Sequence, residues 1–431
     1  MTIDRRRMLG AAGLAGLAIA GTGVRPASAS PGQDAAPPSL NTRLAARAAE
    51  NRHRLEFADG RFSGPAWDLL VSEGRKARFF LLGEEHGIAE NPRLAAALFT
   101  ALSPAGYDTL AIETSPWIAA EMDRAAAEGV EGLRQLFANP ASQAAFYGMR
   151  EEAEMIVAVR AAAQHGQPML WGLDYDVAAD RLAIAQLKVR SKPATADAAL
   201  SRLEEASEAS WAEYETTRAP RHIFNFSGDP ALVRAVRDAW PEADAEAVWL
   251  LTVLEETLEI NRLFMTGAGQ ASNQRRADLN KANLLRYWRA AKAEGRTPRA
   301  MFKFGASHMV RGLSATASFD LGSMVPELAA FEGDTAFSLL VLPGDGRSVA
   351  SFDPSAWTYR AGAPRHDYAA GLEPVAGQAF ADAFTLIDMR PLRSLVSGGS
   401  RSAGVDRELT RVVHGYDAML VLSGSTASGN L

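Results

Sequence analysis

Two segments of the sequence place a histidine shortly after an apolar run that ends in glycine. The first is FFLLGEEH (79–86) and the second is AMFKFGASH (300–308). The unbroken apolar run at 79–82 leaves no polar face, which predicts a strand buried on both sides of a sheet. Loops at the carboxyl ends of such strands are where ligands bind in open α/β sheets. The candidate functional residues from these segments are Glu84, Glu85, His86 and His308.

Two more predicted strands end in acidic residues. The strand predicted at 107–112 is followed by Glu113, and the strand predicted at 168–173 is followed by Asp174 and then Asp176. Both acids also have a structural interpretation. Glu113 can be a negative charge that stabilises the N-terminus of the next helix, and Asp176 can be an N-cap residue. If acids and histidines meet at one edge of the sheet, a histidine can take a proton from water while a carboxylate fixes its tautomer. The same side chains can instead bind a divalent metal through nitrogen and oxygen.

The elements that would position these residues alternate between strand and helix. Three successive strand–helix alternations from residue 79 predict a parallel sheet. Residues 177–294 carry no convincing strand pattern and indicate helices, after which a strand at 300–304 resumes the sheet. We therefore predict an α/β fold, a mostly parallel sheet flanked by helices with a large helical insertion. Further strands are expected at 335–342, 383–389 and 418–422, and helices at 41–54, 65–77, 92–102, 151–164, 250–264 and 274–293.

The start of the chain predicts export. Arg5 and Arg6 precede a short apolar run and a small-residue cleavage site, which together predict a twin-arginine signal peptide at 1–29. The protein is therefore expected to be periplasmic or secreted. The apolar run is too short for a stable membrane span, so no membrane association is expected after cleavage. The predicted parts of the chain are the signal peptide (1–29), a disordered leader (30–40), an α/β catalytic core (41–176 and 295–431) and a helical insertion (177–294).

Composition narrows the classes of function. The chain has 431 residues, of which 47% are hydrophobic and 22% charged, as is typical of a globular protein. Cysteine is absent, which excludes disulfides, thiolate nucleophiles and zinc–thiolate sites. The net charge of -6 and the lack of a basic stripe give no sign of a nucleic-acid partner. The sequence also contains no Gly-x-Ser-x-Gly elbow and no Walker-type phosphate loop.

Four short motifs resemble those of one known group of proteins. GEEH (83–86), LAIE (110–113), GLD (172–174) and GASH (305–308) are similar to motifs of the erythromycin esterase, ChaN and TIKI superfamily. The overall order of motifs is most similar to the erythromycin esterase-like proteins, because the segments 276–283, 321–324 and 416–421 also resemble theirs. Two departures stand out. The first motif has the spacing of ChaN and TIKI, and Gly305 stands where the esterases have an additional histidine.

The resemblance implies an α/β core with a helical insertion and roles for individual residues. It implies that His86 is the water-activating base and that Glu84 and Glu113 are its acidic partners. His308 matches a second essential histidine, and Arg93 matches an arginine in the helix after the first motif. The residues expected to contact substrate are Asp174, Arg276 and Glu85.

The sequence-based hypothesis is an exported hydrolase that acts on an ester, a lactone or a related carbonyl compound. In this mechanism His86 activates water, and His308 with Arg93 or Arg276 stabilises the developing oxyanion. No cofactor is needed, and the expected partner is a small-molecule substrate, with no protein partner inferred. One alternative is a TIKI-like metal-dependent hydrolase or peptidase; the other is a ChaN-like haem- or iron-binding protein. The metal ligands in the first alternative would be Glu84, His86, Glu113 and His308.

Overall fold

The structure is a computed structural model. It describes residues 38–163, 169–344, 348–363, 371–397 and 406–431. The predicted signal peptide (1–29) and the predicted leader up to residue 37 lie outside the described residues. None of the described helices is long and apolar enough to cross a membrane.

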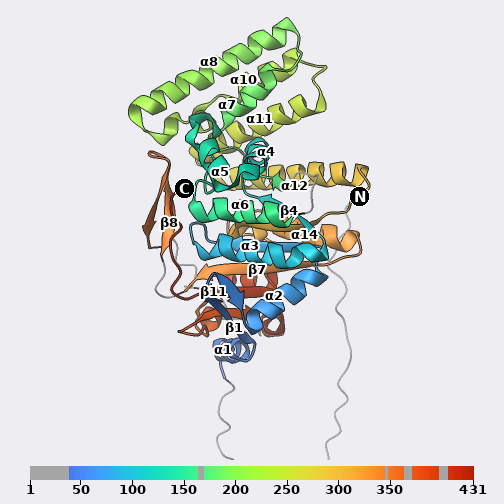
Figure 1. The fold of residues 1–431 in the computed structure, drawn as a ribbon, viewed down its shortest axis with the longest axis vertical. Helices are drawn as coiled ribbons and strands as arrows, with labels where there is room; N and C mark the ends of the chain where they lie inside the picture. The colour runs from blue at the N-terminus through green and yellow to red at the C-terminus, as the bar shows by residue number, and fades with distance from the viewer. Residues whose placement is uncertain (1–37, 164–168, 345–347, 364–370, 398–405) are drawn as a thin grey trace, which may run out of the picture. The chain divides into compact units, whose positions relative to one another are not determined.

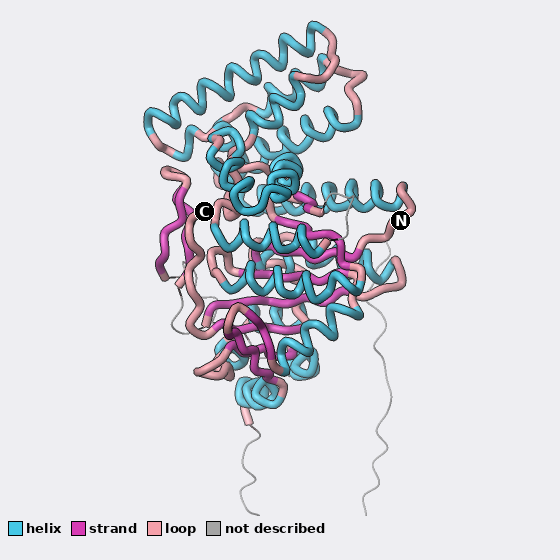
Figure 2. Tube along the Cα trace, in the orientation of Figure 1, coloured by secondary structure: helices cyan, strands magenta, loops and turns pink. Residues whose placement is uncertain are grey.

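Residues 39–431 contain a large, mostly parallel sheet (Figures 1 and 2). The described residues form a nine-stranded sheet with the order β2-β1-β10-β11-β7-β3-β6-β4-β5. Neighbouring strands run parallel from β11 to β5, whereas β10, β1 and β2 add antiparallel pairs at one side. The strands are β1 (Arg52–Ala58), β2 (Arg61–Ser63), β3 (Phe79–Glu84), β4 (Tyr107–Ile112), β5 (Leu170–Gly172), β6 (Arg299–Gly305), β7 (Ala336–Pro343), β10 (Phe384–Asp388) and β11 (Ala418–Leu422).

Helices cover both faces of this sheet, as Figure 1 shows. The helices that follow the first strands are α1 (Leu40–Glu50), α2 (Pro65–Lys76), α3 (Glu90–Leu102), α4 (Pro116–Ala125), α5 (Gly129–Ala138) and α6 (Arg150–Ala162). The later ones are α7 (Asp180–Lys188), α8 (Ala194–Thr217), α9 (Phe224–Ser227), α10 (Pro230–Ala239), α11 (Ala245–Met265), α12 (Gly269–Ala293), α13 (Ala306–Met309), α14 (Leu321–Phe331), α15 (Glu373–Ala376), α16 (Arg393–Val396) and α17 (Arg407–Gly415). The predicted α/β class and helical insertion are thus confirmed.

The two faces of the sheet are buried in separate hydrophobic clusters. Because side chains alternate along a strand, Phe80 and Leu82 of β3 pack with α3 in one cluster, while Phe79 and Leu81 pack with α12 and α14 in the other. All of β3 is buried, which explains why its sequence is continuously apolar. We refer below to the α3 face and the α14 face.

The chain leaves the adjacent strands β3 and β6 in opposite directions along the sheet, toward β4 from β3 and toward β7 from β6. The connection from β3 to β4 runs through α3 on one face, and the connection from β6 to β7 runs through α14 on the other. Since β3 and β6 are hydrogen-bonded neighbours, the two connections diverge at their carboxyl ends. Such a point in an open α/β sheet is where ligands bind.

The described segment between β5 and β6 contains the helices α7 to α12 and no strand. Asp176 ties it to the core: its carboxylate accepts hydrogen bonds from Ser115 Oγ (2.8 Å), Trp117 Nε1 (3.1 Å) and Asn225 Nδ2 (2.5 Å). Asp176 therefore has a structural role at the base of the helices. The last helix, α12, returns to the sheet, where Trp288 packs edge-on against Phe79.

The segment after α1 differs from the sequence-based expectation. The helix predicted at 41–54 ends at Glu50, and Arg52–Ala58 instead forms β1 between β2 and β10. Its alternating pattern suits an edge region of the sheet, where one side of the strand faces solvent. Outside the main sheet, β8 (Val349–Asp353) and β9 (Thr358–Gly362) form a separate antiparallel pair.

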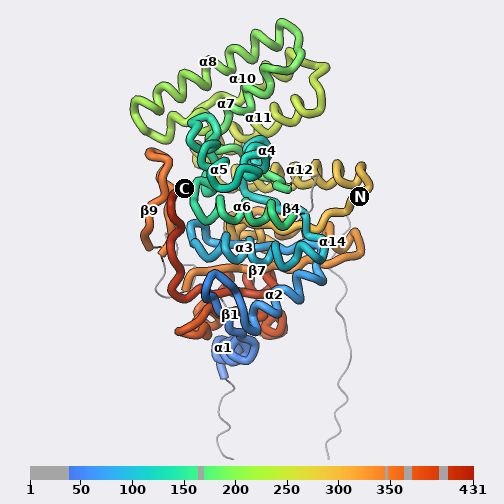
Figure 3. The backbone as a smooth tube through the Cα atoms, viewed as in Figure 1, coloured from blue at the N-terminus to red at the C-terminus, as the bar shows by residue number. Residues whose placement is uncertain are grey.

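The C-terminal residues run past the start of α3 and of α6 (Figure 3). Thr426 donates its backbone N–H (3.0 Å) and its hydroxyl (2.7 Å) to the carboxylate of Glu90. The backbone N–H of Gly429 donates to Glu151 Oε2 (2.9 Å), and that of Ser428 donates to the carbonyl of Gly87 (2.9 Å). The tail therefore holds the loop that follows Glu84 to His86.

Deleting residues 424–431 is expected to destabilise the protein and to lower its activity. The deletion leaves the buried carboxylates of Glu90 and Glu151 without these donors, which should cost roughly 2–4 kcal/mol of unfolding free energy. Urea denaturation of the truncated and full-length proteins measures the difference. A truncated protein with an unchanged denaturation midpoint would show that the tail does not support this loop.

Candidate functional site

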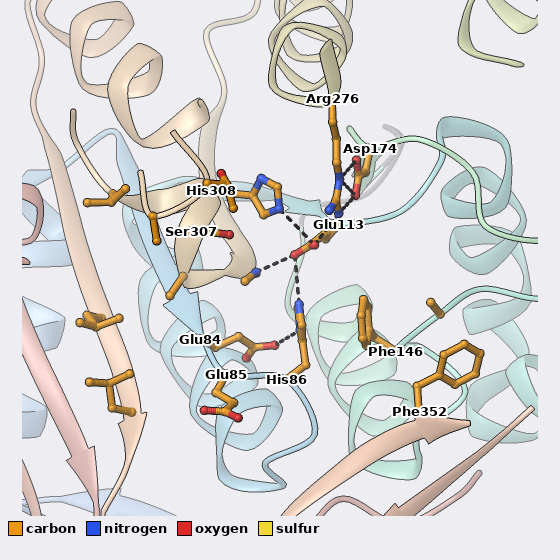
Figure 4. A pocket seen from close by; sticks show the side chains of 18 of the residues that line it. Glu84, Glu85, His86, Glu113, Phe146, Asp174, Arg276, Ser307, His308 and Phe352 are labelled. Carbon is orange, nitrogen blue, oxygen red and sulfur yellow. Dashed lines mark hydrogen bonds and ion pairs between the residues drawn. The ribbon is translucent and has the colours of Figure 1, made fainter. Parts of the chain in front are cut away.

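The sheet brings the predicted residues together at the carboxyl ends of four strands. Glu84 ends β3 and His86 follows it, and Glu113 follows β4. Asp174 follows β5, and His308 lies in α13 directly after β6. All of them line one cavity of about 770 Å³, which Figure 4 shows from close by. This volume is in the range of small-molecule sites.

His86 lies between two carboxylates. Its Nδ1 is 3.1 Å from Glu84 Oε1 and its Nε2 is 3.3 Å from Glu113 Oε2. The imidazole also stacks on the Phe146 ring, with centroids 4.0 Å apart and an interplanar angle of 13°. These contacts fix the position of the ring and its plane. With a proton on Nδ1 donated to Glu84, Nε2 is the nitrogen left to accept a proton, as a general base requires.

Glu113 is the central carboxylate of the site (Figure 4). Its Oε1 accepts from Arg276 Nη2 (2.7 Å) and lies 3.4 Å from His308 Nε2, while its Oε2 accepts from the backbone N–H of Gly305 (2.6 Å). With the contact to His86, each carboxylate oxygen meets one imidazole and one further donor. Glu113 thereby couples the two histidines of the predicted site.

His308 and Arg276 are each fixed by a partner of opposite charge. His308 Nδ1 lies 2.6 Å from Asp320 Oδ2, which leaves His308 Nε2 directed at Glu113. The Arg276 guanidinium forms a bidentate pair with Asp174, with an Nε–Oδ1 distance of 2.9 Å. A bidentate pair gives the arginine one defined orientation.

A second layer of buried charge lies behind Glu84. The ammonium of Lys303, on β6, is 2.6 Å from Glu84 Oε1 and 2.7 Å from Glu152 Oε1 of α6. All three side chains are almost completely buried. Lys303 therefore neutralises part of the charge that Glu84 presents to His86.

The ionisation of the site follows from these contacts. Burial acts to lower the pKa of His86, but the charge of Glu113 and hydrogen bonds with Glu113 and Glu84 outweigh it and raise that pKa to about 9. Burial also acts to lower the pKa of His308. The charge of Glu113 and the contact with Asp320 outweigh it and raise that pKa to about 10. Burial acts to raise the pKa of Glu113, but the two histidines hold it well below its ordinary value.

Glu152 behaves differently from Glu84. Burial raises the pKa of Glu152 to about 7, because Lys303 only partly offsets the loss of hydration and the charge of Glu84 adds to the rise. Lys303 and the contacts with His86 instead outweigh burial at Glu84 and lower its pKa. At neutral pH the Glu84–Lys303 pair is therefore ionised, and Glu152 exchanges its proton near that pH.

The structure does not bring every predicted residue to the same place. Glu85 lines the cavity beside His86, whereas Asp176 lies in the hydrogen-bonded network at the base of the helices. Arg93 does not line the cavity; its guanidinium lies 3.5 Å from Glu151 and 3.9 Å from Glu90 on the far side of the loop. Of the two arginines named for the oxyanion, Arg276 is the one that reaches the site.

Three residues of the site were not predicted from the sequence. Asp320 follows His308 in a loop whose path no local pattern reveals. Lys303 could have been noticed in the sequence, because a lysine within a buried apolar strand needs a partner of opposite charge. Glu152 is one of several acids at the start of α6, and only the packing of that helix against the sheet distinguishes it.

Gly305 leaves space beside His86. A Cβ atom there would lie 3.0 Å from His86 Nε2 and 3.4 Å from Glu113 Oε2. The backbone at Gly305, with φ of -54° and ψ of 141°, is open to any residue, so the glycine is needed for space and not for conformation.

Gly305→Ala is therefore expected to leave the fold intact and to lower kcat at least tenfold on a confirmed substrate. The methyl group would take the space beside Nε2 in which a water molecule must bind, and a small displacement of reacting groups costs about this much or more. Circular dichroism and steady-state kinetics of the variant test this, with Ala306→Gly as the matched control. Full activity of Gly305→Ala would show that the space is not used.

A divalent metal at this site would need carboxylate and imidazole atoms that are free to bind it. Glu113 already accepts hydrogen bonds from Arg276 and Gly305, and Glu84 accepts one from Lys303. Within the described ranges, no group of three or more His, Asp or Glu side chains is arranged to hold a metal ion. As arranged, these side chains fit a hydrogen-bonded network better than a ligand shell.

Comparison with known proteins gives matches in structure only. No family model and no curated protein matches the chain. An erythromycin esterase, EreC, solved as a mutant in its open conformation, matches with a TM-score of 0.56 at 16% identity, over 86% of this chain and 96% of that one. This chain has the fold of an erythromycin esterase. The resemblance drawn from the four motifs is thus confirmed at the level of the fold.

Two further solved structures match over a similar extent. A succinoglycan biosynthesis protein has a TM-score of 0.58 at 12% identity, over 92% of this chain and 100% of that one. A protein from Bacillus cereus has a TM-score of 0.53 at 15% identity, again over 92% and 100%. At these identities the comparisons establish the architecture, and the activity has to be argued from the site.

Proposed function

We propose that this protein is an exported hydrolase that uses water activated by His86 to cleave an ester, a lactone or a related carbonyl compound. The observation that carries the proposal is the placement of His86, which lines the cavity with Nδ1 beside Glu84 and Nε2 beside Glu113. The fold shared with an erythromycin esterase adds support. In the proposed site a general base, its orienting carboxylate and candidate oxyanion donors meet within one cavity.

The proposed reaction begins with water beside His86 Nε2. The imidazole takes a proton from the water as the water oxygen forms a bond to the carbonyl carbon, and Glu84 stabilises the resulting imidazolium. The carbon–oxygen bond to the leaving group then breaks. His86 returns the proton to the leaving alkoxide, so that one ester and one water give one carboxylic acid and one alcohol.

The oxyanion would be stabilised by Arg276 and His308, which contact Glu113 Oε1, whereas His86 contacts Oε2. Arg276 is held by Asp174 and His308 by Asp320, so both keep positive charge at fixed positions beside Glu113, where it would favour a developing negative oxygen. The pKa of His308, about 10, keeps its imidazole protonated at the pH at which His86 acts as a base. The carboxylates of Glu113 and Asp320 thus keep His308 positively charged, as stabilisation of an oxyanion requires.

A panel of esters and lactones tests the proposal directly. Purified mature protein is expected to hydrolyse at least one of them, and the activity is expected to disappear in the His86→Ala variant. Hydrolysis that persists in this variant would come from a contaminant or another site. A broad panel without any hydrolysis would contradict the proposal.

Chelation separates the metal-free mechanism from the metal-dependent alternative. We propose the metal-free mechanism because Arg276 and Lys303 already occupy the carboxylates that would bind the ion. Activity is then expected to survive EDTA and to gain nothing from added Mn²⁺, Co²⁺ or Zn²⁺. Loss of activity in EDTA, with recovery on adding one of these ions, would overturn this choice.

Export by the twin-arginine route is proposed on the sequence alone. Replacing Arg5 and Arg6 together with lysine is expected to leave the precursor in the cytoplasm, because the exporter reads the arginine pair. Cell fractionation followed by immunoblotting measures the distribution. Unchanged delivery of mature protein would rule out this route.

A further inference from the structure

The geometry points to a substrate whose carbonyl group carries an aromatic arm on one side and an aliphatic arm on the other. The inference rests on the proposed hydrolase function and specifies its substrate class. It comes from the side chains that line the cavity, which differ in kind on the two sides of the catalytic residues.

The aromatic side of the cavity lies near the α3 face of the sheet. Phe146, Phe226 and Phe352 line it, and Phe146 stacks directly on the His86 ring. Phe352 comes from β8, and Figure 4 shows Phe146 and Phe352 together on one side of His86. Each of these rings is only partly buried, so part of its surface is available to a ligand. Aromatic walls favour a flat or ring-shaped group.

The aliphatic side lies on the α14 face. Leu340 and Leu342 at the end of β7 line it, together with Leu372 and Val412 of the neighbouring loop and α17. All four residues belong to the hydrophobic cluster of that face and are at most 4% exposed. These four side chains are aliphatic, so this side suits an alkyl chain.

The catalytic residues lie between these two sides. Glu84 and Gly305 end the adjacent strands β3 and β6, and α13 carries His308 across the end of the sheet. In Figure 4 Ser307 and the Phe146–Phe352 pair lie on opposite sides of the line from His308 to His86. Because one continuous cavity includes both sides, a bound carbonyl compound can extend in both directions from the reacting carbon.

Burial of apolar groups would then supply much of the binding energy. A polar group placed against the phenylalanine or leucine side chains would lose its hydration without gaining replacement hydrogen bonds from them. An alkyl group instead gains about threefold to fourfold in affinity for each methylene that it buries. The cavity thus selects for lipophilic esters that carry both kinds of arm.

Two series of esters test this, whichever arm is the acyl group. One runs from phenyl acetate to phenyl octanoate, and the other runs from methyl benzoate to octyl benzoate. In at least one series, kcat/KM is expected to rise about threefold per methylene until the aliphatic side is filled. Esters that are hydrolysed equally well at all chain lengths would overturn this inference and leave the hydrolase function standing. No hydrolysis of any ester, in these series or in the wider panel, would overturn both.

A variant locates the alkyl arm. Val412→Phe adds bulk to the aliphatic side and is expected to lower the ratio of long-chain to short-chain kcat/KM at least tenfold. The matched control is Val248→Phe on the exposed surface of α11, where Val248 is 44% exposed, and there the ratio is expected to match that of the unmodified protein. If Val412→Phe proves unstable, Leu342→Ala replaces it and is expected to shift the preferred chain to greater length. A chain-length preference that neither variant changes would overturn the placement of the arm.

Discussion

Replacing His86 with alanine is expected to lower kcat on a confirmed substrate by a factor of about 10² to 10⁴, the range for loss of a general base. The fold should persist, because His86 lies in a loop and its side chain remains 24% exposed. Steady-state kinetics measure the loss, and circular dichroism checks the fold. His53, on β1 and away from the cavity, is the matched control, and His53→Ala is expected to keep full activity.

The dependence of the rate on pH tests the same role. Below pH 9 His86 is mostly an imidazolium, which cannot accept a proton, so kcat/KM should rise with pH through about 9 and then fall as His308, whose pKa is about 10, loses its proton. Glu113 makes the larger electrostatic contribution to the raised pKa and Glu84 a smaller one. Replacing either with glutamine is therefore expected to move the midpoint to lower pH, with the larger shift for Glu113→Gln. It should also lower the maximal rate, because the imidazolium formed during the reaction loses a stabilising charge.

The outcomes separate general-base catalysis from a structural role. If His86 only maintained the shape of the cavity, its replacement would reduce activity equally at every pH. If His86 acted as an acid, the rate would fall as pH rises through 9. Full activity of His86→Ala on a confirmed substrate would contradict both the metal-free mechanism and the metal-dependent alternative.

The elements around the site could be predicted because their chemistry is local. β4 and β11 were predicted with the bounds that the structure has, since short apolar runs between turn residues describe strands buried on both faces. The same argument located Glu84, Glu113 and His308 at strand ends. Their convergence follows from the parallel sheet, which places all carboxyl ends at one edge.

Other features could not be predicted because they depend on distant contacts. β1 is strand because it pairs with β10, whose residues are more than 300 positions away in the chain. Arg93 matches the family pattern, yet the carboxylates of Glu90 and Glu151 hold it outside the cavity. Asp320 reaches His308 only through the loop before α14, and no residue type or spacing encodes that path.

Lys303 was visible in the sequence as a lone charge within an apolar strand, and its replacement gives the largest expected effect on stability. In Lys303→Met the carboxylates of Glu84 and Glu152 remain buried without the cation that lies 2.6 and 2.7 Å from them. Removing one partner from a buried ion pair costs about 3–5 kcal/mol of unfolding free energy. Urea denaturation at pH 7 measures the loss. The control is Lys188→Met, whose partner Glu204 lies in an exposed pair, and its expected cost is at most about 1 kcal/mol.

The loss in Lys303→Met should depend on pH in a defined direction. Burial already raises the pKa of Glu152 to about 7, and without the ammonium the pKa values of both carboxyls should rise further. A group whose pKa is raised on folding contributes stability below its unfolded pKa and loses it as pH rises through the folded value. The variant should therefore approach the stability of the unmodified protein near pH 5 and fall away from it above pH 7. The double variant Lys303→Met/Glu152→Gln removes one of the uncompensated charges and should recover part of the loss at pH 7. A Lys303→Met protein as stable as the unmodified one at every pH would show that water or rearranged side chains solvate these carboxylates, and Glu84 would then not need Lys303 to remain charged beside His86.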